Sequence, residues 1–540
     1  MTSAGNVMYR SIGSVTSGLG ATLKRGGRAF LWLVVLGLQP VASPAQQTTV
    51  PLHHQVYPLL NRGETQKLFS SYHLRVLPLT RTEVLNLLRE MKRHERRLSG
   101  ADRRLLRQML AEFTDPAPGE PAPPESEIHA YRYDEGQTQL FLDLRVQQTF
   151  RFSRNRLNID SENISETLGS VAVRGRLSAS LFFAAEARNT MVLGEPDLIE
   201  NFDPQAGPIQ VTVGAAAFKD QAIGYFAGKW GRLGVLIGRN QIGWGSWLQE
   251  QLGLSGSNEP MDLIQLHLDW QRFRFSYFHA TLQGIADRRY LAGHRLDLWL
   301  SPGIQLGAYE TVVYGGRGPE PGYLNPVVPY QIIEHQLGDR DNNTFGVDFN
   351  LFPLSGLRIF GEIFVDDLSF DKPLGTYWGN KLAYLAGLHW VRPFKTGTAE
   401  FTFTYTRVDP FVFTHYDSLN IYAHYGQSLG TRLGPNADRL LARVAYQPHR
   451  DVRLSLTFHR IRKGEGALFG PFRPRQGESK GFLRGTLEFT SAWTLALRNQ
   501  IRRDIFLGLN VTMLRRDNAG RIGGKRVFER YARFFLDVNY

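Results

Sequence analysis

The stretch that decides the fold is MDLIQLHLDWQRFRFSYFHATL, residues 261–282. Apolar and polar side chains alternate along its first half: Ile264, Leu266, Leu268 and Trp270 against Gln265, His267 and Asp269. A period of two indicates a β-strand with one apolar and one polar face. A break near Arg272 leads into a second such strand, and two more are expected at about 290–300 and 304–314. The stretch predicts consecutive sheet strands that lead into a loop at 315–341 rich in Gly, Pro and Tyr.

The same alternation continues from about residue 128 to the end, and the lengths of the connections indicate what kind of sheet it builds. Tight breaks are expected near Leu177, Trp230, Arg272, Pro302, Ser355, Phe394, Arg450 and Arg502. Long polar connections alternate with them at about 153–167, 191–221, 241–260, 315–341, 368–379, 409–437, 463–478 and 516–524. Turns at one end and loops at the other are typical of outer-membrane barrels. We therefore predict an all-β, antiparallel transmembrane barrel.

The number of strands follows from this alternation of short and long connections. It gives about 18 strands if the strand-like segment Leu419–Gly426 belongs to the 409–437 loop. An even number returns the last strand to the periplasmic side, where the chain began. That strand ends in the aromatic residue Tyr540, which resembles the terminal signal read by the barrel-insertion machinery.

The N-terminal segment predicts that the chain is exported from the cytoplasm. It has 540 residues, no cysteine and no run of 18 apolar residues that could form a spanning helix. An apolar segment, Ala29–Leu38, follows basic residues and precedes a plausible cleavage site after Ala45, so residues 1–45 are expected to be a signal peptide. The formal charge of +13 does not indicate nucleic-acid binding, because the chain is exported and no run of five basic residues follows the signal.

The basic residues are mostly arginine, 52 Arg against 11 Lys. A guanidinium grips a carboxylate with two parallel hydrogen bonds, which suits an acidic polymer ligand or ion-pair ladders inside a polar lumen. The sequence leaves both possibilities open.

A small helical domain is expected before the barrel, at residues 46–114. Thr80 and Glu83 have capping-box spacing, and Val84, Leu87 and Leu88 then repeat at helical spacing. A Pro-rich linker at 115–127 separates this domain from the barrel at 128–540. Because the barrel must have a filled or open lumen, the helical domain is a candidate plug at its periplasmic end.

Sugar binding requires aromatic rings that stack on pyranose faces and planar polar groups that bind hydroxyls. The long connections provide these candidate ligand residues: Trp244, Trp247, Arg317, Tyr323, Asn325, Tyr330, Tyr416, Tyr422 and Arg432, with His424 and Tyr425 nearby. The alternative for any one of them is a place in the aromatic girdle of the membrane interface or in the packing of a folded-in loop.

Four carboxylates are expected to form a charge network in the lumen: Glu310, Glu362, Asp366 and Asp367. The alternation places Glu310 on the lipid face, so we expect a β-bulge that turns it inward. Paired carboxylates also raise the possibility of a glycoside hydrolase, but nothing in the sequence defines their separation. No spacing marks a nucleophile with its base or a set of metal ligands, so the prediction is a protein that is not an enzyme, without metal or cofactor.

The residues also resemble a known family, the capsule-assembly Wzi family. The resemblance rests on the order of Gly238-Arg239, Trp244-Gly245, Leu254-Ser255, His294-Arg295-Leu296-Asp297, Tyr309-Glu310, Tyr323-Leu324-Asn325-Pro326, Asn343 with Asp348, Glu362 with Asp366-Asp367, Leu429-Gly430 and Leu433-Gly434-Pro435-Asn436. The segments Tyr57-Pro58-Leu59-Leu60 and Leu77-Pro78-Leu79-Thr80-Arg81 are similar as well. The resemblance covers nearly all of the mature chain.

The resemblance implies an 18-stranded outer-membrane barrel with a periplasmic helical bundle. Such a protein is expected to act as a lectin that retains exported capsular polysaccharide or another exopolysaccharide, with outer-membrane lipid around it. The alternative from a different class is a porin-like channel for anionic or sugar solutes. A third possibility is the same scaffold with another surface glycan or a protein as ligand.

Overall fold

The computed structural model describes residues 47–70, 75–115, 126–155, 161–194, 211–214, 216–247, 249–285, 287–470 and 479–539. The predicted signal peptide, most of the predicted linker and the terminal Tyr540 lie outside these residues. All distances and contacts below concern the described part of the chain.

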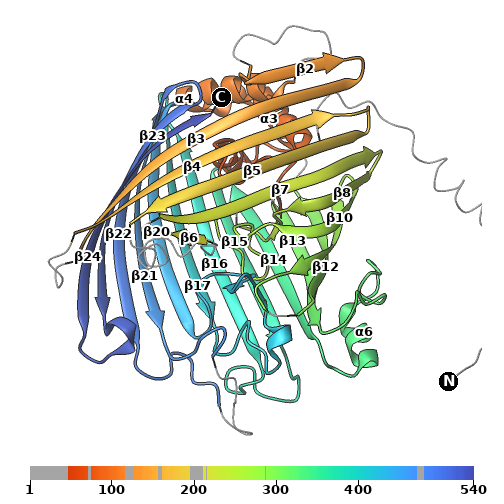
Figure 1. Ribbon diagram of the computed structural model, residues 1–540, viewed down its shortest axis with the longest axis vertical. Helices are drawn as coiled ribbons and strands as arrows, with labels where there is room; N and C mark the ends of the chain where they lie inside the picture. Colours follow the sequence, from red (N-terminus) through yellow and green to blue (C-terminus); the bar gives the residue numbers. More distant parts are fainter. Residues whose placement is uncertain are drawn as a thin grey trace, which may run out of the picture.

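Eighteen antiparallel strands close into a barrel, because the last strand pairs with the first (Figure 1). Its strands are β3 (Thr138–Asn155), β4 (Ser161–Arg176), β5 (Leu181–Leu193), β7 (Ala216–Trp230), β8 (Leu233–Asn240), β10 (Met261–Asp269), β11 (Phe273–Leu282), β12 (Arg289–Ser301), β13 (Ile304–Gly315), β14 (Asn342–Leu354), β15 (Leu357–Asp367), β16 (Lys381–Pro393), β17 (Thr398–Val408), β20 (Ala437–His449), β21 (Val452–Lys463), β22 (Glu488–Arg502), β23 (Ile505–Asp517) and β24 (Arg526–Asn539). The predicted fold class and strand number are confirmed. Two short strands pair with the wall: β2 (Tyr131–Glu135) with β3, and β6 (Val211–Val213) with β7.

The barrel has a short-turn end and a long-loop end, as the connection lengths predict. The segment expected to belong to the 409–437 loop forms no wall strand. It contributes β18 (Ala423–His424) to a small hairpin within the loop, whose other strand is β19 (Gln427–Ser428). The parity argument therefore assigned this segment correctly.

The outer surface of the wall carries exposed apolar side chains. Phe226, Ile237 and Ile264 lie side by side on β7, β8 and β10 and are 57%, 53% and 46% exposed. Such an apolar band around the outside is what a barrel needs where it contacts lipid chains.

Three helices pack together at the short-turn end, where Figure 1 shows them in orange. They are α2 (Val56–Thr65), α3 (Arg81–Arg93) and α4 (Gly100–Phe113), and the 3-10 turn Glu95–Arg97 joins the last two. α3 begins at the expected capping box, in which Thr80 and Glu83 bond each other's backbone N–H groups. Their apolar faces form a core of their own, with Leu60, Leu88 and Met109 completely buried.

The remaining helical elements lie at the long-loop end: α6 (Tyr330–Leu337) and the 3-10 turns Ser418–Asn420 and Ala519–Arg521. None of the helices in the described ranges has the length and apolar character needed to cross a membrane.

The helical region reaches into the lumen through a two-stranded sheet. β1 (Val76–Leu77) pairs with β9 (Gly243–Trp244), which belongs to the connection between β8 and β10. A backbone hydrogen bond of 3.1 Å from Gly245 to Arg75 extends this pairing. The chain before the barrel is thus tied to a loop that comes from the long-loop end.

Candidate functional site

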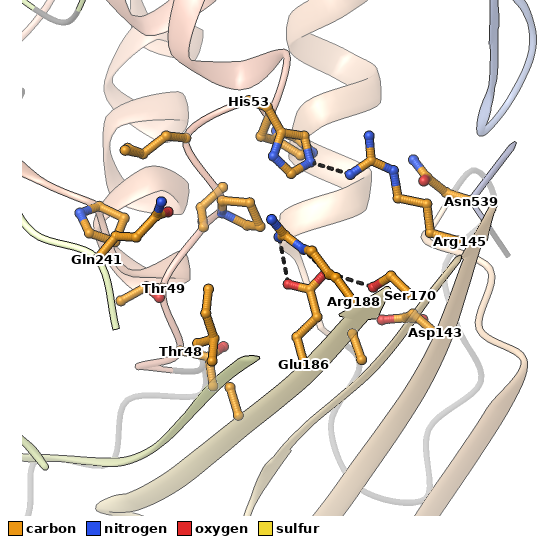
Figure 2. Close-up of a pocket in the computed structure, with 18 of the residues that line it drawn as sticks. Thr48, Thr49, His53, Asp143, Arg145, Ser170, Glu186, Arg188, Gln241 and Asn539 are labelled. Atoms are coloured by element: carbon orange, nitrogen blue, oxygen red, sulfur yellow. Dashed lines mark hydrogen bonds and ion pairs between the residues drawn. The ribbon is translucent and has the colours of Figure 1, made fainter. Parts of the chain in front are cut away.

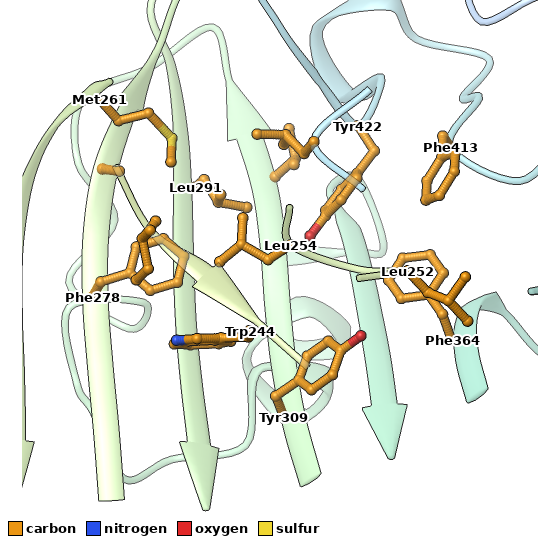
Figure 3. Close-up of a cluster of buried hydrophobic side chains, with 14 of the residues drawn as sticks. Trp244, Leu252, Leu254, Met261, Phe278, Leu291, Tyr309, Phe364, Phe413 and Tyr422 are labelled. Carbon is orange, nitrogen blue, oxygen red and sulfur yellow. The ribbon is translucent and has the colours of Figure 1, made fainter. Parts of the chain in front are cut away.

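Two long connections, 241–260 and 409–436, fold into the barrel and fill its centre. Trp244, Leu252 and Leu254 of the first meet Phe413 and Tyr422 of the second in one buried cluster (Figure 3). The ring of Trp244 lies 5.0 Å from that of Phe278 on β11, edge to face. Burial of so much apolar area keeps both loops inside the wall.

The predicted ligand residues Trp244, Trp247 and Tyr422 all belong to this packing. Trp247 stacks on Phe360 at 4.5 Å with the rings 6° from parallel, and it is only 2% exposed. Tyr422 donates to or accepts from Thr311 at 3.0 Å and is completely buried. In this conformation their rings hold the loops in the lumen and have no free face for a sugar.

Glu362 and Asp366 hold the two loops from the wall. Glu362 accepts hydrogen bonds from the backbone N–H groups of Leu252 at 3.1 Å and Gly253 at 3.3 Å, and from the hydroxyl of Tyr309 at 2.6 Å. Asp366 accepts from the backbone N–H of Phe413 at 2.7 Å. The partners of the two carboxylates are backbone N–H groups of the inward loops and the hydroxyl of Tyr309 on β13. Asp367 lies at the end of β15, more than half exposed, 3.6 Å from Lys381.

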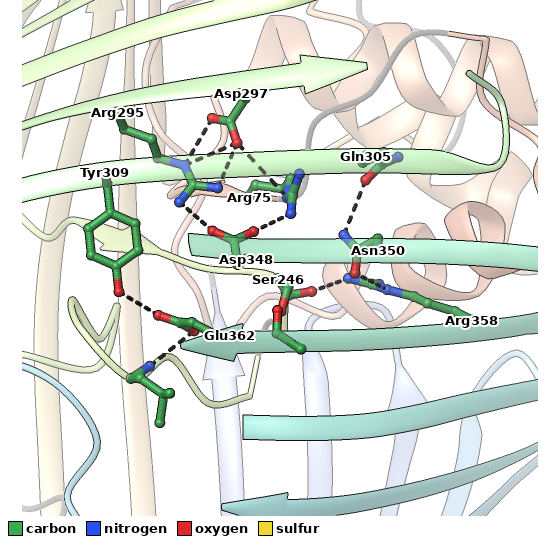
Figure 4. A network of polar contacts seen from close by, with 12 residues as sticks. Arg75, Ser246, Arg295, Asp297, Gln305, Tyr309, Asp348, Asn350, Arg358 and Glu362 are labelled. Atoms are coloured by element: carbon green, nitrogen blue, oxygen red, sulfur yellow. Dashed lines mark hydrogen bonds and ion pairs between the residues drawn. The ribbon is translucent and has the colours of Figure 1, made fainter. Parts of the chain in front are cut away.

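Buried ion pairs attach the helical region to the wall (Figure 4). Asp348 on β14 binds Arg75 on one side and Arg295 on the other, the latter at 2.7 Å, and Arg295 also binds Asp297 at 2.6 Å. A second pair joins Arg358 on β15 to Glu64 of α2 at 2.8 Å.

Two further pairs complete the attachment: Arg62 of α2 with Glu400 of β17 at 3.2 Å, and Glu83 of α3 with Arg274 of β11. The predicted arginine ladders of the lumen therefore exist, and they include arginines of both parts of the chain.

The 315–341 loop folds over the outer face of the wall, and α6 lies outside the barrel in Figure 1. Tyr323 and Tyr330 are completely buried against Tyr314 of β13 and its neighbours. Arg317 forms two hydrogen bonds with Asp341, of 2.9 and 2.6 Å, and the hydroxyl of Tyr323 donates to the same carboxylate at 2.8 Å. These predicted ligand residues join the loop to the wall.

The expectation that a bulge turns Glu310 inward was wrong. Its register with His294 on β12 and Phe345 on β14 is continuous, and Phe345 is exposed on the outer face. Glu310 therefore stays on the outer face and is not part of the lumen network. It is satisfied there because the start of α6 covers it: the N–H groups of Tyr330 and Gln331 donate at 2.9 and 2.8 Å. The positive end of a helix stabilises the carboxylate.

We expect the docking of α6 on the wall to depend on pH through the carboxyl group of Glu334. Burial, followed by the nearby charges of Asp341 and Asp339, raises the pKa of this carboxyl to about 8. Because the folded pKa lies above the unfolded one, the stabilisation is complete below about pH 4.5 and is lost as the pH rises towards 8. Docking should weaken by about 1.4 kcal/mol per pH unit in that window.

A spin label at Gln336→Cys should report this change as increasing mobility between pH 5 and pH 9. The label is unique because the chain has no cysteine. Adding Glu334→Gln should remove most of the pH response. An equal response in both proteins would exclude Glu334 as its source.

The remaining predicted ligand residues are accessible at the long-loop end. Tyr416 is 70% exposed and packs only one side on His415, at 4.3 Å. Asn325 is exposed, and its side chain accepts a hydrogen bond from Val327. Arg432 is half-buried and donates to the carbonyl of Ser257 at 2.9 Å. Of their neighbours, His424 is buried and Tyr425 is partly exposed.

Arg432 lines a groove of about 470 Å³ between three loops at this end, which we call the basic groove. Among the described residues that line it, Lys463 and Arg521 are the other cations and Glu488 is the one carboxylate. Lys463 is positioned by a 2.7 Å bond to the carbonyl of Leu433, and Arg521 by a 3.2 Å bond to that of Gly464. Lys463 and Arg521 were not among the ligand residues that the sequence predicted. Their position inside the predicted long connections 463–478 and 516–524 was the only signal.

A second and larger cavity, of about 860 Å³, lies in the lumen between the segment 48–55 and strands β3 to β7 (Figure 2). Six arginine or lysine side chains and seven carboxylates line it, so its charge is nearly balanced. Arg188 pairs with Glu186, and Arg145 lies 3.0 Å from His53 and pairs with Asp537. Its charged groups provide hydrogen-bond donors and acceptors for water or a hydroxyl-rich ligand.

Within the described ranges, no group of three or more His, Cys, Asp or Glu side chains has the arrangement of a metal site. The structure therefore has three features that bear on function: a lumen filled by loops, the basic groove at the long-loop end, and a cavity with charged lining beside the helices.

These features define a class: an outer-membrane β-barrel whose lumen is occupied by its own loops and helices. The family of capsule assembly protein Wzi matches residues 216–518, more than half of the chain. The chain belongs to this family, and it is located in the outer membrane. No curated protein sequence matches it.

Among solved structures, the fold is similar to Wzi from Escherichia coli, described as an outer-membrane protein involved in group 1 capsule assembly and a carbohydrate-binding β-barrel. The sequences are 13% identical, the match covers 89% of this chain and 97% of the other, and the TM-score is 0.58. OprE of Pseudomonas aeruginosa aligns with a TM-score of 0.44 at 9% identity over 74% of this chain and 98% of its own. OccAB1 of Acinetobacter baumannii aligns at 0.43 and 10% over 74% and 96%.

Proposed function

We propose that this protein is an outer-membrane lectin that holds an acidic capsular polysaccharide or other exopolysaccharide at the cell surface. The observation that carries the proposal is the basic groove. Arg432, Lys463 and Arg521 converge there, and Glu488 is the single carboxylate among the described lining residues. Cations fixed by backbone carbonyls can donate charge-assisted hydrogen bonds to the carboxylates of an acidic glycan. The carbohydrate binding described for the similar Escherichia coli barrel agrees with this.

Tyr416 and Asn325 remain candidate contacts to the same polymer. The exposed ring of Tyr416 offers a flat apolar face, and Asn325 offers an amide for hydroxyl groups. For Trp244, Trp247, Arg317, Tyr323, Tyr330 and Tyr422, glycan contact would require movement of the loops that they hold in place.

We infer that the helical region at 46–114 acts as a plug at the periplasmic end. The ion pairs of Arg75, Glu64 and Arg62 with the wall support this, because they fix the region inside the barrel. The inward loops fill the centre from the other end. A channel for sugars or anions would require the helical region and the inward loops to move out of the lumen. Outer-membrane lipid and the barrel-insertion machinery are the other expected partners.

We infer binding without catalysis. Glycoside hydrolysis requires two carboxyl groups on either side of the scissile bond. Glu488 is the one carboxylate among the lining residues of the basic groove, and its Oε2 accepts from the N–H of Gly520 at 2.6 Å. A groove with several cations and one carboxylate among its described lining residues supports retention of a polymer better than its cleavage.

The test is to compare polysaccharide binding and conductance for the purified barrel. The protein should retain acidic polysaccharide from the host cell surface on a column and elute with salt, because exposed charges are screened at high ionic strength. In a planar bilayer it should conduct far less than an open porin of equal strand number. Free ion flow without polysaccharide binding would support the channel and refute the lectin.

A further inference from the structure

The hairpin of α3 and α4 carries a dense set of cations around the turn between the two helices. These cations are Lys92, Arg93, Arg96, Arg97, Arg103, Arg104 and Arg107, and we call them the basic tip. Five of them are exposed, and Arg103 and Arg104 are partly exposed. All seven belong to the continuous described range 75–115, and every contact used below joins described residues.

The carboxylates of the same segment do not balance this charge. Residues 91–107 contain two of them, Glu95 and Asp102. Asp102 is completely buried and pairs with Arg62 of α2 at 2.7 Å. Glu95 pairs with Lys92 at 2.7 Å, and this hydrogen bond, together with the charges of Lys92 and of two arginines on α4, lowers the pKa of its carboxyl. The basic tip therefore keeps an excess of positive charge.

Helix stability does not explain the spacing of these cations. Arg89 and Arg93 stand four residues apart on α3, and Arg103 and Arg107 stand four residues apart on α4. Side chains at this spacing are neighbours on a helix surface, so two cations there repel each other and destabilise the helix. A bound anion would remove this repulsion.

The basic tip rests on the short-turn rim of the barrel. At the start of α4, the N–H of Ala101 donates to the carbonyl of Thr396, in the turn between β16 and β17, at 2.8 Å. Arg97 donates to the hydroxyl of Ser355, in the turn between β14 and β15, at 2.6 Å. These two contacts place the tip at the edge of the wall and not over the centre of the lumen.

The outer face of the same rim has the side chains of a membrane interface. Trp390, near the end of β16, is 44% exposed, and Leu354 and Phe394 at the two turns are 54% and 48% exposed. Arg392 follows Trp390 on the same face and lies over the ring of Phe394 at 6.0 Å. Exposed aromatic rings mark the level at which a barrel leaves the apolar core of the membrane. The basic tip therefore lies at the level of the lipid headgroups.

We propose that the basic tip binds the anionic headgroups of phospholipids in the periplasmic leaflet of the outer membrane. The lipid phosphates would lie between the tip and Arg392, with the acyl chains beside Trp390 and Phe394. Each lysine or arginine next to an anionic membrane surface favours binding by about fivefold. A soluble acidic polymer would match the charge of the tip but not the apolar side chains at the rim. The proposal goes beyond glycan binding and does not depend on it.

The experiment measures which lipid lies beside the tip. His94→Cys, an exposed position among the cations, carries a bimane fluorophore, and this label is unique because the chain has no cysteine. The full-length protein is placed in nanodiscs of phosphatidylcholine and phosphatidylglycerol. A small fraction of one lipid or the other carries a nitroxide near the headgroup end of its acyl chain, which quenches bimane only at short range. Folded barrels are identified by their gel mobility before heating.

Quenching by labelled phosphatidylglycerol should exceed quenching by labelled phosphatidylcholine severalfold. High salt should reduce this preference, because it screens exposed charges. Arg93→Gln, Arg96→Gln and Arg107→Gln together should remove most of it. Equal quenching by the two lipids at low salt would overturn the proposal. So would binding of polyglutamate to the tip without any lipid preference, because that result would assign the surface to a soluble acidic partner.

The matched control removes three accessible cations from other parts of the same rim, by Arg176→Gln, Arg232→Gln and Arg272→Gln. These arginines lie at the turns that follow β4, β7 and β10, away from the turns that the tip contacts. The control changes the net charge equally, so it should keep the lipid preference at the tip. Equal loss in both triple variants would mean that the overall charge of the protein gathers the lipid, and it would overturn the proposal.

Discussion

Replacing Asp348 by asparagine is expected to loosen the proposed plug, the helical region before the barrel, and to let ions through the barrel. The carboxylate lies between Arg75 and Arg295, and all three side chains are almost completely buried. Asp348→Asn would remove the carboxylate that the two buried guanidinium groups share, and Asp297 would remain within 3.9 Å of Arg75 and 2.6 Å of Arg295. Removing one partner of a buried ion pair typically costs about 3 to 5 kcal/mol. Because Arg75 precedes the β1–β9 pairing, we expect that pairing to open, visible as conductance steps in a planar bilayer and as a lower unfolding midpoint.

Two variants make this result specific. Asp262→Asn breaks an ion pair with Arg239 whose carboxylate is 55% exposed, so it should change stability by less than about 1 kcal/mol and leave the barrel closed. Arg75→Gln combined with Asp348→Asn should be milder than Asp348→Asn alone, because Arg295 keeps its 2.6 Å pair with Asp297. A closed barrel with an unchanged midpoint in Asp348→Asn would contradict the role of this network.

Neutralising the basic groove is expected to abolish retention of acidic polysaccharide while the barrel stays folded. The variant combines Arg432→Gln, Lys463→Gln and Arg521→Gln, which removes the cations among the described residues that line the groove. With about 1 kcal/mol for each charged contact, affinity should fall about a hundredfold. The salt dependence of binding should weaken as well, because fewer charges take part. Column retention of labelled polysaccharide at two salt concentrations measures both effects.

The matched control removes three exposed arginines at the same end of the barrel but outside the groove, by Arg288→Gln, Arg340→Gln and Arg526→Gln. It changes the net charge equally, so it should keep most of the retention if the groove is the site. Equal loss in both variants would mean that general charge attraction, not the groove, holds the polymer.

The wall of the barrel was predictable because its signal is local. Alternation along a strand such as Met261–Asp269 depends only on which residues face lipid and which face inward. The lengths of turns and loops are also local, and they gave the correct parity, with the 419–426 segment inside its loop. The capping box at Thr80 was found for the same reason, since both of its partners lie within one helical turn.

The candidate site was predictable only in part, because it depends on which loops turn inward and which outward. From the sequence, Trp244 is expected to be an exposed aromatic residue of a loop. In the structure its backbone belongs to β9, which pairs with β1, more than 160 positions earlier in the chain. Arg432 was found as a lone cation of a loop. Its neighbours Lys463 and Arg521 join it only when three loops meet above the wall.

The sequence by itself determined the number of strands, the closed antiparallel sheet and the ends at which turns and loops lie, because these follow from a period of two and from connection lengths. Only the tertiary structure decided on which face of the wall single charged residues lie and which partners they have. Glu310 stays on the outer face because α6 covers it with N–H donors. Asp348 holds a contact to the chain before the barrel because Arg75 reaches it from another part of the sequence. The burial and partners of a charge depend on segments that are distant in sequence, and no local pattern records them.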